Sequence, residues 1–384
     1  MAGSYEQEIQ ALEQNCTWKI TPLLVGKKPI GCKWVFKTKL KADGFVERYK
    51  ARWVAKGYNQ VEGIDYTESL SPMAKAITVR IFLAIIVGYA WPIQQLDINN
   101  TFSHGYLDED LYMDPPEGYN VEPGFVCKLE RSLYGLKQAS RQWNLEFTHK
   151  LEQYGFAQSA KDHCLFTMHT NLGQLFLLVY VDDILITGPS LSDIEGVKSY
   201  LHSLFTIKDI GGARYFLGLE IARSTSGAYL AQTKYTLDII KDTAMLNSKA
   251  TSTPFPPGLK VPLILEHSCR IHISLHVVRY LKGNPSKGFL PASNLFQLKA
   301  FCDADWASCA DTRRSLSGFC IFLGDAPISW KTKKQSTVSR STAEAEYRSM
   351  AATSTTYAPV KGAAQPTTDD VIDLELSDES EVLY

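Results

Sequence analysis

Tyr180-Val-Asp-Asp-Ile-Leu-Ile186 decides the fold, because it places two adjacent aspartates between two apolar runs. These runs, 175–181 and 184–187, predict the strands of a β-hairpin. An uncompensated buried carboxylate costs on the order of several kcal/mol, and neighbouring like charges repel each other. A raised pKa, a cationic partner or a bound metal would relieve that cost. From this motif alone, a hairpin turn, where Asp is common, and a metal site are equally good interpretations.

A third carboxylate, Asp97, ends a predicted strand over residues 91–98. An amphipathic stretch over 131–156 predicts a helix after Gly135, between that strand and the hairpin. The order strand, helix, hairpin is that of a ferredoxin-like β-α-β-β unit. Three carboxylates at strand ends suit hard divalent cations, which prefer oxygen ligands. We therefore expect Asp97, Asp182 and Asp183 to hold metal ions that activate a hydroxyl and stabilise a leaving pyrophosphate.

The rest of the chain contains further elements on either side of this unit. A short amphipathic helix is predicted over 6–15, and an Asp43-Gly44 turn joins two Lys/Arg-rich β runs, 32–39 and 46–54. A helix over 193–204 and strands near 215–222 and 228–232 follow the hairpin. After Thr253 several prolines break the chain, and the next segment is expected to be short and irregular. A β-rich patch over 298–330, a helix over 343–352 and a disordered Thr-, Pro- and acid-rich tail from 358 complete the prediction.

The net charge and the cysteine content limit the possible partners and metal sites. The net charge is −1, but residues 361–384 hold one Lys and seven acids and carry −6, so the remainder carries +5. That mild excess of positive charge is compatible with phosphate binding. The eight cysteines form no C-x-x-C pair, which argues against a zinc site or a disulfide framework. Without a signal peptide or a long apolar run, we expect a soluble intracellular protein with no membrane partner, in either cytoplasm or nucleus.

Six segments resemble copia-type reverse transcriptases, in the order in which that family has them. They are Tyr49-Lys-Ala-Arg-Trp-Val-Ala-Lys-Gly-Tyr-Asn-Gln60, Gly63-Ile-Asp-Tyr-Thr-Glu68, Gln95-Leu-Asp-Ile-Asn-Asn-Thr-Phe102, Ser132-Leu-Tyr-Gly-Leu-Lys-Gln-Ala-Ser-Arg-Gln-Trp143, Tyr180-Val-Asp-Asp-Ile-Leu-Ile186 and Tyr215-Phe-Leu-Gly-Leu-Glu-Ile221. The similarity is nearly continuous from Glu6 to Pro254. It implies an α+β right-hand polymerase with fingers and a ferredoxin-like palm over residues 1–254.

The resemblance also implies roles for single residues. Asp97, Asp182 and Asp183 match the family's catalytic, metal-binding aspartates, so two Mg²⁺ ions, with Mn²⁺ as the alternative, are expected as cofactors. Phe102 matches an aromatic residue that excludes the 2′-hydroxyl of ribonucleotides. Arg52, with Lys50 and Lys56, matches finger cations that clamp a triphosphate, although a solvated basic face explains each of them equally well.

Two further motifs complete the polymerase resemblance. Gly135, Lys137 and Gln138 lie in the loop that supports the template and the incoming nucleotide, and residues 217–221 match the primer grip. The implied partners are an RNA template, a DNA primer and deoxynucleoside triphosphates. Trp53, Ser103, Tyr106 and Ser69-Leu70 depart from the family pattern, which suggests a copy that has drifted.

The C-terminal third resembles only part of the same polyproteins. Residues 255–290 are expected to be a collapsed remnant of the thumb and connection. Residues 291–357 resemble a partial RNase H-like α/β segment, in which Asp303 and Glu346 match the first two metal-binding carboxylates. Two more acids expected further downstream do not follow, so we predict no RNA-strand cleavage and a vestigial site.

The acidic tail over 358–384 carries Val371-Ile-Asp-Leu-Glu-Leu-Ser-Asp-Glu-Ser380, which resembles a SUMO-interacting motif. A solvated acidic tail is the plainer interpretation of this segment. Three hypotheses remain from the sequence. The chain is an RNA-directed DNA polymerase impaired by loss of the thumb, a non-enzymatic remnant whose tail binds a protein partner, or a translation product that does not accumulate as folded protein.

Overall fold

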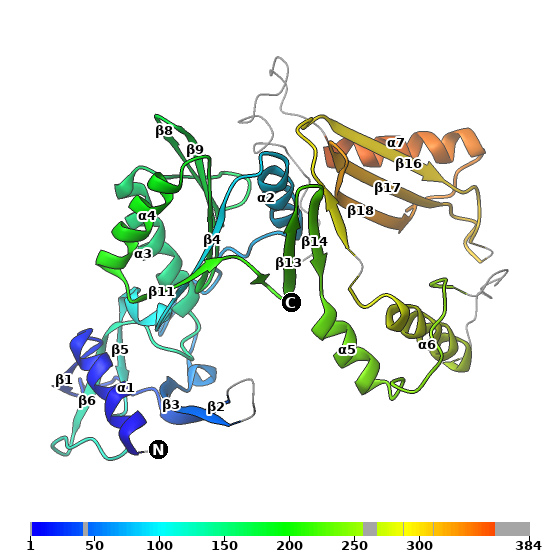
Figure 1. The fold of residues 1–384 in the computed structure, drawn as a ribbon. Coiled ribbons are helices and arrows are strands. Elements are labelled where there is room, and N and C mark those ends of the chain that lie inside the picture. Colours follow the sequence, from blue (N-terminus) through cyan, green and yellow to red (C-terminus); the bar gives the residue numbers. More distant parts are fainter. Residues whose placement is uncertain (1, 41–44, 256–266, 287, 310, 358–384) are drawn as a thin grey trace.

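The computed structural model describes residues 2–40, 45–255, 267–286, 288–309 and 311–357 (Figure 1). The Asp43-Gly44 turn and the acidic tail with its Val371–Ser380 motif lie outside these residues. The described residues form helices and five sheets of two to six strands. No helix in the described ranges is long and apolar enough to cross a membrane.

A six-stranded sheet, here called the central sheet, carries the hairpin. Its strands lie in the order β11 (Ile207–Gly212), β4 (Ile93–Ile98), β10 (Asp183–Thr187), β9 (Gly173–Tyr180), β8 (Leu165–Thr170) and β7 (Ala157–Gln158). All neighbouring strands in it are antiparallel.

Helices cover both faces of the central sheet. α3 (Ala139–Tyr154) and α4 (Leu191–Leu204) lie together on one face (Figure 1) and share a core with Leu177 and Ile184. α2 (Ala76–Gly88) packs on the other face against Phe176, Leu178 and Leu185. Because successive side chains of a strand point to opposite faces, two covered faces require the uninterrupted apolar run that β9 has.

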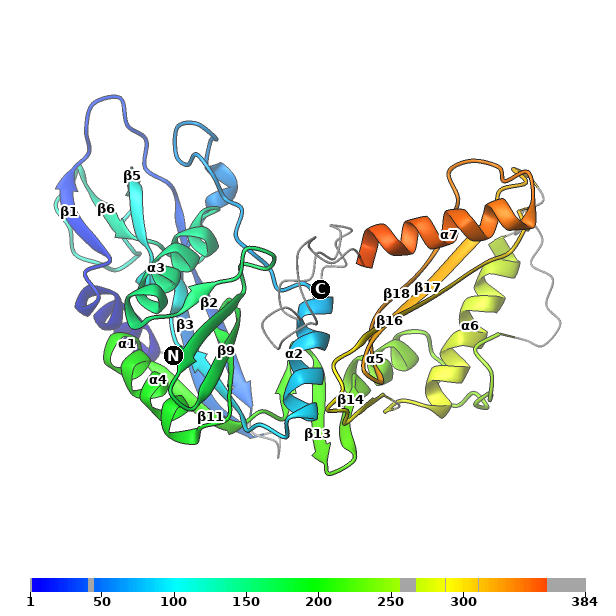
Figure 2. The ribbon, with the colours of Figure 1, turned by 90° about the horizontal axis from the view of Figure 1, so that it is seen from above.

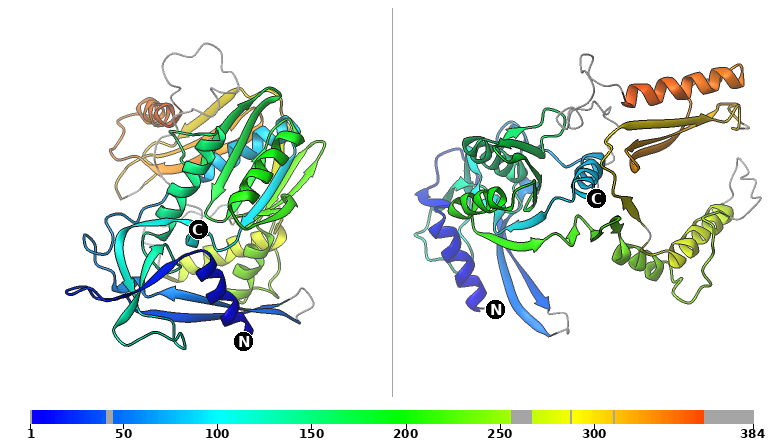
Figure 3. Two further views of the ribbon diagram at one scale, coloured as in Figure 1. Left: turned by 90° about the vertical axis from the view of Figure 1, so that its left-hand side faces the viewer. Right: turned by 45° about the horizontal axis from the view of Figure 1, so that its top comes forward.

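The N-terminal third forms a second body beside the central sheet. α1 (Ala2–Gln14) packs near a three-stranded sheet of β1 (Trp18–Pro22), β6 (Phe125–Arg131) and β5 (Tyr106–Met113). The long hairpin of β2 (Cys32–Leu40) and β3 (Val46–Ala55) projects from it (Figure 3). Two short 3-10 helices, η1 (Gly57–Asn59) and η2 (Thr101–His104), connect these elements.

A four-stranded sheet follows the central sheet in sequence. Its strands lie in the order β12 (Tyr215–Phe216), β13 (Leu219–Ser224), β14 (Gly227–Ala231) and β15 (Phe289–Pro291). Two helices, α5 (Thr233–Asp242) and α6 (His267–Gly283), contact each other between β14 and β15. The expectation of a short irregular segment here needs correction, because α6 is a helix of 17 residues.

The last sheet contains β16 (Leu298–Ala304), β17 (Leu316–Leu323) and β18 (Ala326–Lys334), in that order. α7 (Thr342–Tyr357) packs along β16 and β17. α2 lies between this sheet and the central sheet (Figures 1 and 2), and its core is continuous with Ile321, Leu323 and Ile328. One helix therefore joins the two sheets into a single packed body.

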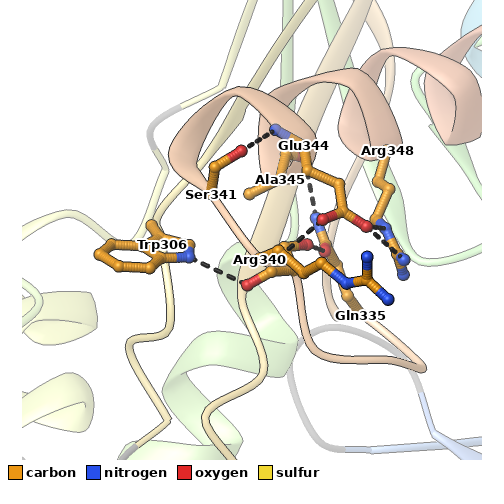
Figure 4. Close-up of polar contacts among 8 residues, drawn as sticks. Trp306, Gln335, Arg340, Ser341, Glu344, Ala345 and Arg348 are labelled. Atoms are coloured by element: carbon orange, nitrogen blue, oxygen red, sulfur yellow. Dashed lines mark hydrogen bonds and ion pairs between the residues drawn. The ribbon is translucent and has the colours of Figure 1, made fainter.

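Polar contacts fix the start of α7 (Figure 4). Ser341 Oγ accepts a hydrogen bond from the Glu344 backbone N–H at 3.2 Å, and the Glu344 carboxylate accepts one from the Arg340 N–H at 2.7 Å. This reciprocal pattern caps the first turn, whose amides have no partner inside the helix. Gln335 Nε2 donates to the Ala345 carbonyl and to Ser317 Oγ, both at 2.9 Å, so the helix start is tied to β17.

Candidate active site

The Tyr-Val-Asp-Asp motif forms the tight hairpin that its sequence predicts. Asp183 pairs with Tyr180, so Val181 and Asp182 make a two-residue loop between β9 and β10. Val181 has φ of 55°, a left-handed conformation that is strained for a β-branched residue. Such strain persists only where the surroundings hold the backbone in place, and it is common at functional sites.

Two hydrogen bonds hold this strained loop. The indole Nε1 of Trp143, on α3, donates to the Val181 carbonyl at 2.8 Å. The Ile98 backbone N–H, at the end of β4, donates to the Asp182 carbonyl at 2.9 Å. The tip of the hairpin is therefore fixed both to a helix and to the strand that carries Asp97.

Strand register brings the predicted carboxylates together. Asp97 lies directly opposite Asp183 in the β4–β10 pair, and directly opposed residues have Cβ atoms about 4.5–5.5 Å apart. Both point to the face opposite α3 and α4, since Ile184 and Ile186 on β10 pack against those helices. On the other side of β4, Lys208 of β11 is the register partner of Asp97. The site is a row of one cation and two opposed carboxylates, with Asp182 in the adjoining loop.

The environment opposes ionisation of two of these aspartates. Burial raises the pKa of Asp182, the Asp97 carboxylate raises it further, and Arg52 and Lys50 lower it. Burial also raises the pKa of Asp183. A hydrogen bond that Gln95 Nε2 donates to its Oδ1 at 3.2 Å lowers this pKa, and the Asp182 and Asp97 carboxylates raise it further by repulsion. Nearby cations therefore offset only part of the electrostatic cost.

A divalent cation would compensate that remaining charge. The donors are carboxylate oxygens, which Mg²⁺ prefers, and Mg²⁺ is usually held by one or two carboxylates while keeping several waters. Within the described ranges, no three Asp, Glu, His or Cys side chains gather tightly enough to enclose one ion. The donor set fits an open site that shares its ion with a ligand, and it does not fit a closed structural site.

Arg52 lies near these carboxylates in a stack of side chains. Its guanidinium lies 4.0 Å from the centre of the Tyr134 ring, and its Nη2 donates to the Tyr134 hydroxyl at 3.1 Å. Tyr134 in turn meets Phe102 edge to face, with ring centres 4.8 Å apart. Tyr134, for which the sequence predicted no role, thus contacts both the predicted clamp residue and the predicted aromatic gate.

Arg52 also has an unsatisfied donor. Its Nε is shielded from solvent and has no partner among the described residues. A buried donor without a partner costs about 1–3 kcal/mol, so an acceptor from a ligand would be favourable here. Lys50, two residues earlier on β3, has its pKa lowered by burial and by the Arg52 cation, and Glu8 of α1 opposes that effect. Both cations lie close enough to Asp182 to affect its pKa.

The loop over residues 135–138 lies against the end of β3. Gly135 has φ of +95°, and a Cβ there would lie 2.2 Å from the Ala55 carbonyl oxygen, so only glycine fits. Gln138 is fully buried and donates to the Asp65 carbonyl at 3.0 Å. Lys137 Nζ donates to the Gln60 carbonyl and to the Tyr66 hydroxyl. These two side chains hold the loop in place, and their predicted contact with a nucleotide stays a prediction.

Asp303 and Glu346 lie on neighbouring elements, as expected. Asp303 is on β16 and Glu346 is on α7. Ser349, three residues after Glu346, donates from its Oγ to the Asp303 carbonyl at 3.0 Å, which fixes helix against strand. In the described part of the chain, no third acid joins them to form a metal-binding cluster.

The turn predicted as a primer grip is tight. Leu217 has φ of 49° and Gly218 has φ of 79° between β12 and β13. No sequence pattern indicated a role for Trp143, Gln95, Lys208 or Tyr134. Trp143 and Tyr134 lie in the motif over residues 132–143, and Gln95 begins the motif over 95–102, but only the fold shows their contacts. Lys208 lies in no motif, so strand register alone reveals it.

Comparisons with known proteins identify the family of this chain. Residues 15–257 match the family described as reverse transcriptase (RNA-dependent DNA polymerase). The chain is 39% identical over 391 residues to the retrovirus-related Pol polyprotein from transposon RE1 of Arabidopsis thaliana, a match that covers 90% of the chain and 27% of that protein. It is 34% identical over 402 residues to the Pol polyprotein from transposon TNT 1-94 of Nicotiana tabacum, with 91% of the chain and 30% of that protein covered.

The chain thus spans less than a third of the length of these two relatives. A solved structure of a foamy viral protease–reverse transcriptase in complex with double-stranded DNA shares 13% sequence identity, with a TM-score of 0.44. That match covers 91% of this chain and 58% of the other.

Proposed function

Because this chain belongs to the reverse transcriptase family of copia-type retrotransposon Pol polyproteins, we propose that it catalyses RNA-templated DNA synthesis at Asp97, Asp182 and Asp183. The observation that carries the proposal is the strand register. It sets Asp97 opposite Asp183 at the tip of a hairpin that Trp143 and Ile98 hold in a strained conformation. A surface turn would need neither the strain nor the two anchoring hydrogen bonds.

We also propose that the central sheet is the palm and that the β2–β3 hairpin belongs to the fingers. Support comes from the order β11-β4-β10-β9, in which the first strand of the unit lies between its third and fourth strands. With α3 and α4 on one face, this is the arrangement of a ferredoxin-like unit. The opposite face, toward which Asp97 and Asp183 point, would receive the substrate.

The side chains divide the work in this proposal. Asp97, Asp182 and Asp183 would hold the divalent ions, which when bound lower the pKa of the primer hydroxyl and stabilise the leaving pyrophosphate. Arg52 would donate to the triphosphate, since its shielded Nε has no partner among the described residues. Tyr134 positions both Arg52 and Phe102, so the phosphate contact and the sugar gate depend on one ring.

The template and primer would be held weakly. A polymerase grips the duplex mainly through phosphate contacts from basic side chains. Between β14 and β15 the described chain offers α5 and α6 for this purpose, fewer elements than a full thumb and connection supply. We therefore propose short extension products, and no RNA-strand cleavage at Asp303 and Glu346.

Primer extension on an RNA template tests the activity, with the Asp182→Asn variant as the control for contaminating polymerases. Removing one electrostatic contribution to a transition state costs a factor on the order of 10²–10³ in rate, so the variant should lose nearly all extension. The matched surface variant Asp110→Asn, which removes a carboxylate that pairs with Lys128 at 2.7 Å, should keep it. Equal extension by wild type and Asp182→Asn would rule the proposal out.

A further inference from the structure

The C-terminal sheet of β16, β17 and β18 has two faces of different character. Gln335 ties the start of α7 to Ser317, so α7 lies over the face that Ser317 occupies (Figures 1 and 2). Because successive residues of a strand point to opposite faces, the strand register assigns a different set of side chains to the other face, here called the open face. It carries Lys299, Phe301, Leu316, Phe322, Trp330 and Lys334, all of them exposed or half-buried.

Aromatic side chains lie in a row across the open face. Phe301 of β16 is the register partner of Cys320, and Cys320 is the partner of Trp330 on β18. Phe301 is 62% exposed and Trp330 is 51% exposed, and the small Cys320 lies between them. Phe322 meets Phe301 edge to face, with ring centres 5.8 Å apart. The row is therefore an apolar surface on which other ring systems can stack.

Cations lie on both sides of this row. Arg80 of α2 lies 4.2 Å from the centre of the Trp330 ring. Lys299 is the register partner of Phe322, and its exposed ion pair with Asp325 is 3.4 Å long. Exposed pairs contribute little to stability, so Lys299 can exchange Asp325 for another anion at low cost. The rings thus have positive charge beside them at either end of the row.

The charge of the whole segment also favours an anionic partner. Residues 298–340 hold seven Lys or Arg and four Asp, which gives a net charge of +3. Asp303 lies on the open face itself, two residues along β16 from Phe301, and it opposes this attraction locally. An anion is therefore expected at the Lys299 and Arg80 positions, away from Asp303.

A row of exposed rings with cations beside it matches a single nucleic-acid strand. Unpaired bases stack on aromatic side chains whatever their sequence, while their phosphates bind Lys and Arg. One common RNA-binding module stacks two or three bases on aromatic side chains of a sheet in this way. A duplex keeps its base faces stacked inside, and an apolar protein surface would gain nothing from the cations.

We propose that the open face of the C-terminal sheet binds an unpaired nucleic-acid strand, with bases stacked on Phe301 and Trp330 and phosphates at Lys299 and Arg80. This site is separate from the carboxylates of the central sheet. The proposal does not depend on polymerase activity, and the Asp182→Asn variant should bind such a strand as wild type does.

Titration of a fluorescein-labelled dT12 strand into the full chain tests the proposal, without primer, nucleotide or divalent ion. Phe301→Leu keeps an apolar side chain and removes the ring. Loss of one stacked base weakens single-strand binding by about tenfold, so the Kd of this variant should rise by about that factor. Tyr347→Leu removes a ring that is 70% exposed on α7 and should leave the Kd unchanged. Equal Kd values for wild type and Phe301→Leu would overturn the proposal.

Salt dependence gives an independent measurement. Each phosphate contact with a single strand contributes about 0.7 to the slope of log K against log salt, so Lys299→Gln should lower this slope by about that amount. Phe301→Leu should leave the slope as in wild type, because it removes no charge. An unchanged slope in Lys299→Gln would show that this lysine binds no phosphate.

Crosslinking locates the strand on the chain. A dT12 strand that carries 5-iodouracil should attach to the peptides that contain Phe301 or Trp330. Crosslinks to the central sheet alone would place the strand elsewhere and contradict the proposal. A dimer that Phe301→Leu dissociates, with no change in strand binding, would show that a second copy covers the open face instead.

Discussion

At the scale of single residues, ionised aspartates in the hairpin should lower the stability of the folded chain by a measurable amount. Burial raises the pKa of Asp183, and the other carboxylates raise it further, so the folded chain holds this proton to a higher pH than the unfolded chain does. Below the ordinary value of 3.8 both states are protonated and the effect is absent. As the pH rises from 3.8 through the raised pKa, folding stability is lost.

The Asp183→Asn variant should therefore unfold at a higher denaturant concentration than wild type above that pH window, when divalent ions are absent. The difference should vanish as the pH falls toward 3.8. With Mg²⁺ present, wild type should become more stable than Asp183→Asn, because Mg²⁺ binds the wild-type carboxylates and stabilises the folded chain by mass action. Urea unfolding across pH, with and without Mg²⁺, measures both effects.

The surface variant Asp110→Asn is a control, because the pKa of Asp110 is lowered in the folded chain whereas that of Asp183 is raised. The hydrogen bond from Lys128 lowers the pKa of Asp110, so its charge stabilises the folded chain and its replacement should not increase stability. A wild type that is more stable than Asp183→Asn at neutral pH without metal would contradict the predicted electrostatic cost.

The sequence predicted which carboxylates lie together better than it predicted the contacts that hold them. Asp97, Asp182 and Asp183 stood out because acids at the ends of apolar strands are costly unless a cation compensates them. Lys208 was missed, because its position opposite Asp97 depends on the register of β11, which no local pattern specifies. Lys137 and Gln138 were assigned to substrate from their motif, yet their side-chain donors bind the chain itself.

At the scale of elements, the loop at Gly135 lies between the β2–β3 hairpin and Tyr134, which contacts Arg52 and Phe102. Its backbone lies so close to β3 that a Cβ at Gly135 would lie 2.2 Å from the Ala55 carbonyl oxygen. Gly124 offers a matched comparison, because its φ is +91° and a Cβ there would meet nothing within 4 Å. Both positions share the strain of a left-handed conformation, but only one has the steric clash.

Gly135→Ala should therefore lower the free energy of unfolding by about 1–3 kcal/mol more than Gly124→Ala does, which is the usual cost of overpacking. Denaturant titration of the two variants gives the difference. The added Cβ would displace the loop and with it Tyr134, which contacts Arg52 and Phe102. The KM for nucleotide should therefore rise in Gly135→Ala alone. Equal destabilisation by the two variants would show that the loop has room to move.

Element prediction failed mainly after Thr253. The prolines predicted a break correctly, since Pro254 and Phe255 belong to no helix or strand. The helix α6 was missed because its apolar residues follow no clear amphipathic pattern, and tertiary contacts hold it. Lys282 Nζ donates to the Ser248 carbonyl and Arg279 Nε donates to the Lys249 carbonyl, so the helix is fixed by the segment that follows α5.

At the scale of the whole molecule, α2 packs against both the central sheet and the sheet of β16, β17 and β18. Beyond its apolar core, Arg80 lies 4.2 Å from the centre of the Trp330 ring and donates to the Ile328 carbonyl at 3.3 Å. These contacts connect a helix of the polymerase region with the last strand of the C-terminal sheet. No sequence pattern predicts such a contact, because Arg80 and Trp330 lie far apart in the chain.

A double-mutant cycle of Arg80→Leu and Trp330→Leu should give a coupling energy of about 0.5–2 kcal/mol, the range for cation–π pairs. Urea unfolding of the four proteins supplies it. Because the core is continuous, each single variant should shift the whole unfolding transition. A separate early transition of the C-terminal sheet in wild type would show that the two sheets unfold independently.

The double-sided packing of α2 has a practical consequence for anyone who divides this chain. A fragment that stopped at Pro254 would keep the central sheet and the three aspartates, yet it would leave one side of α2 without its cover of Ile321, Leu323 and Ile328. An apolar surface of that kind on an otherwise polar protein promotes self-association. Low yield of such a fragment would therefore reflect an uncovered helix, and it would carry no information about the polymerase chemistry.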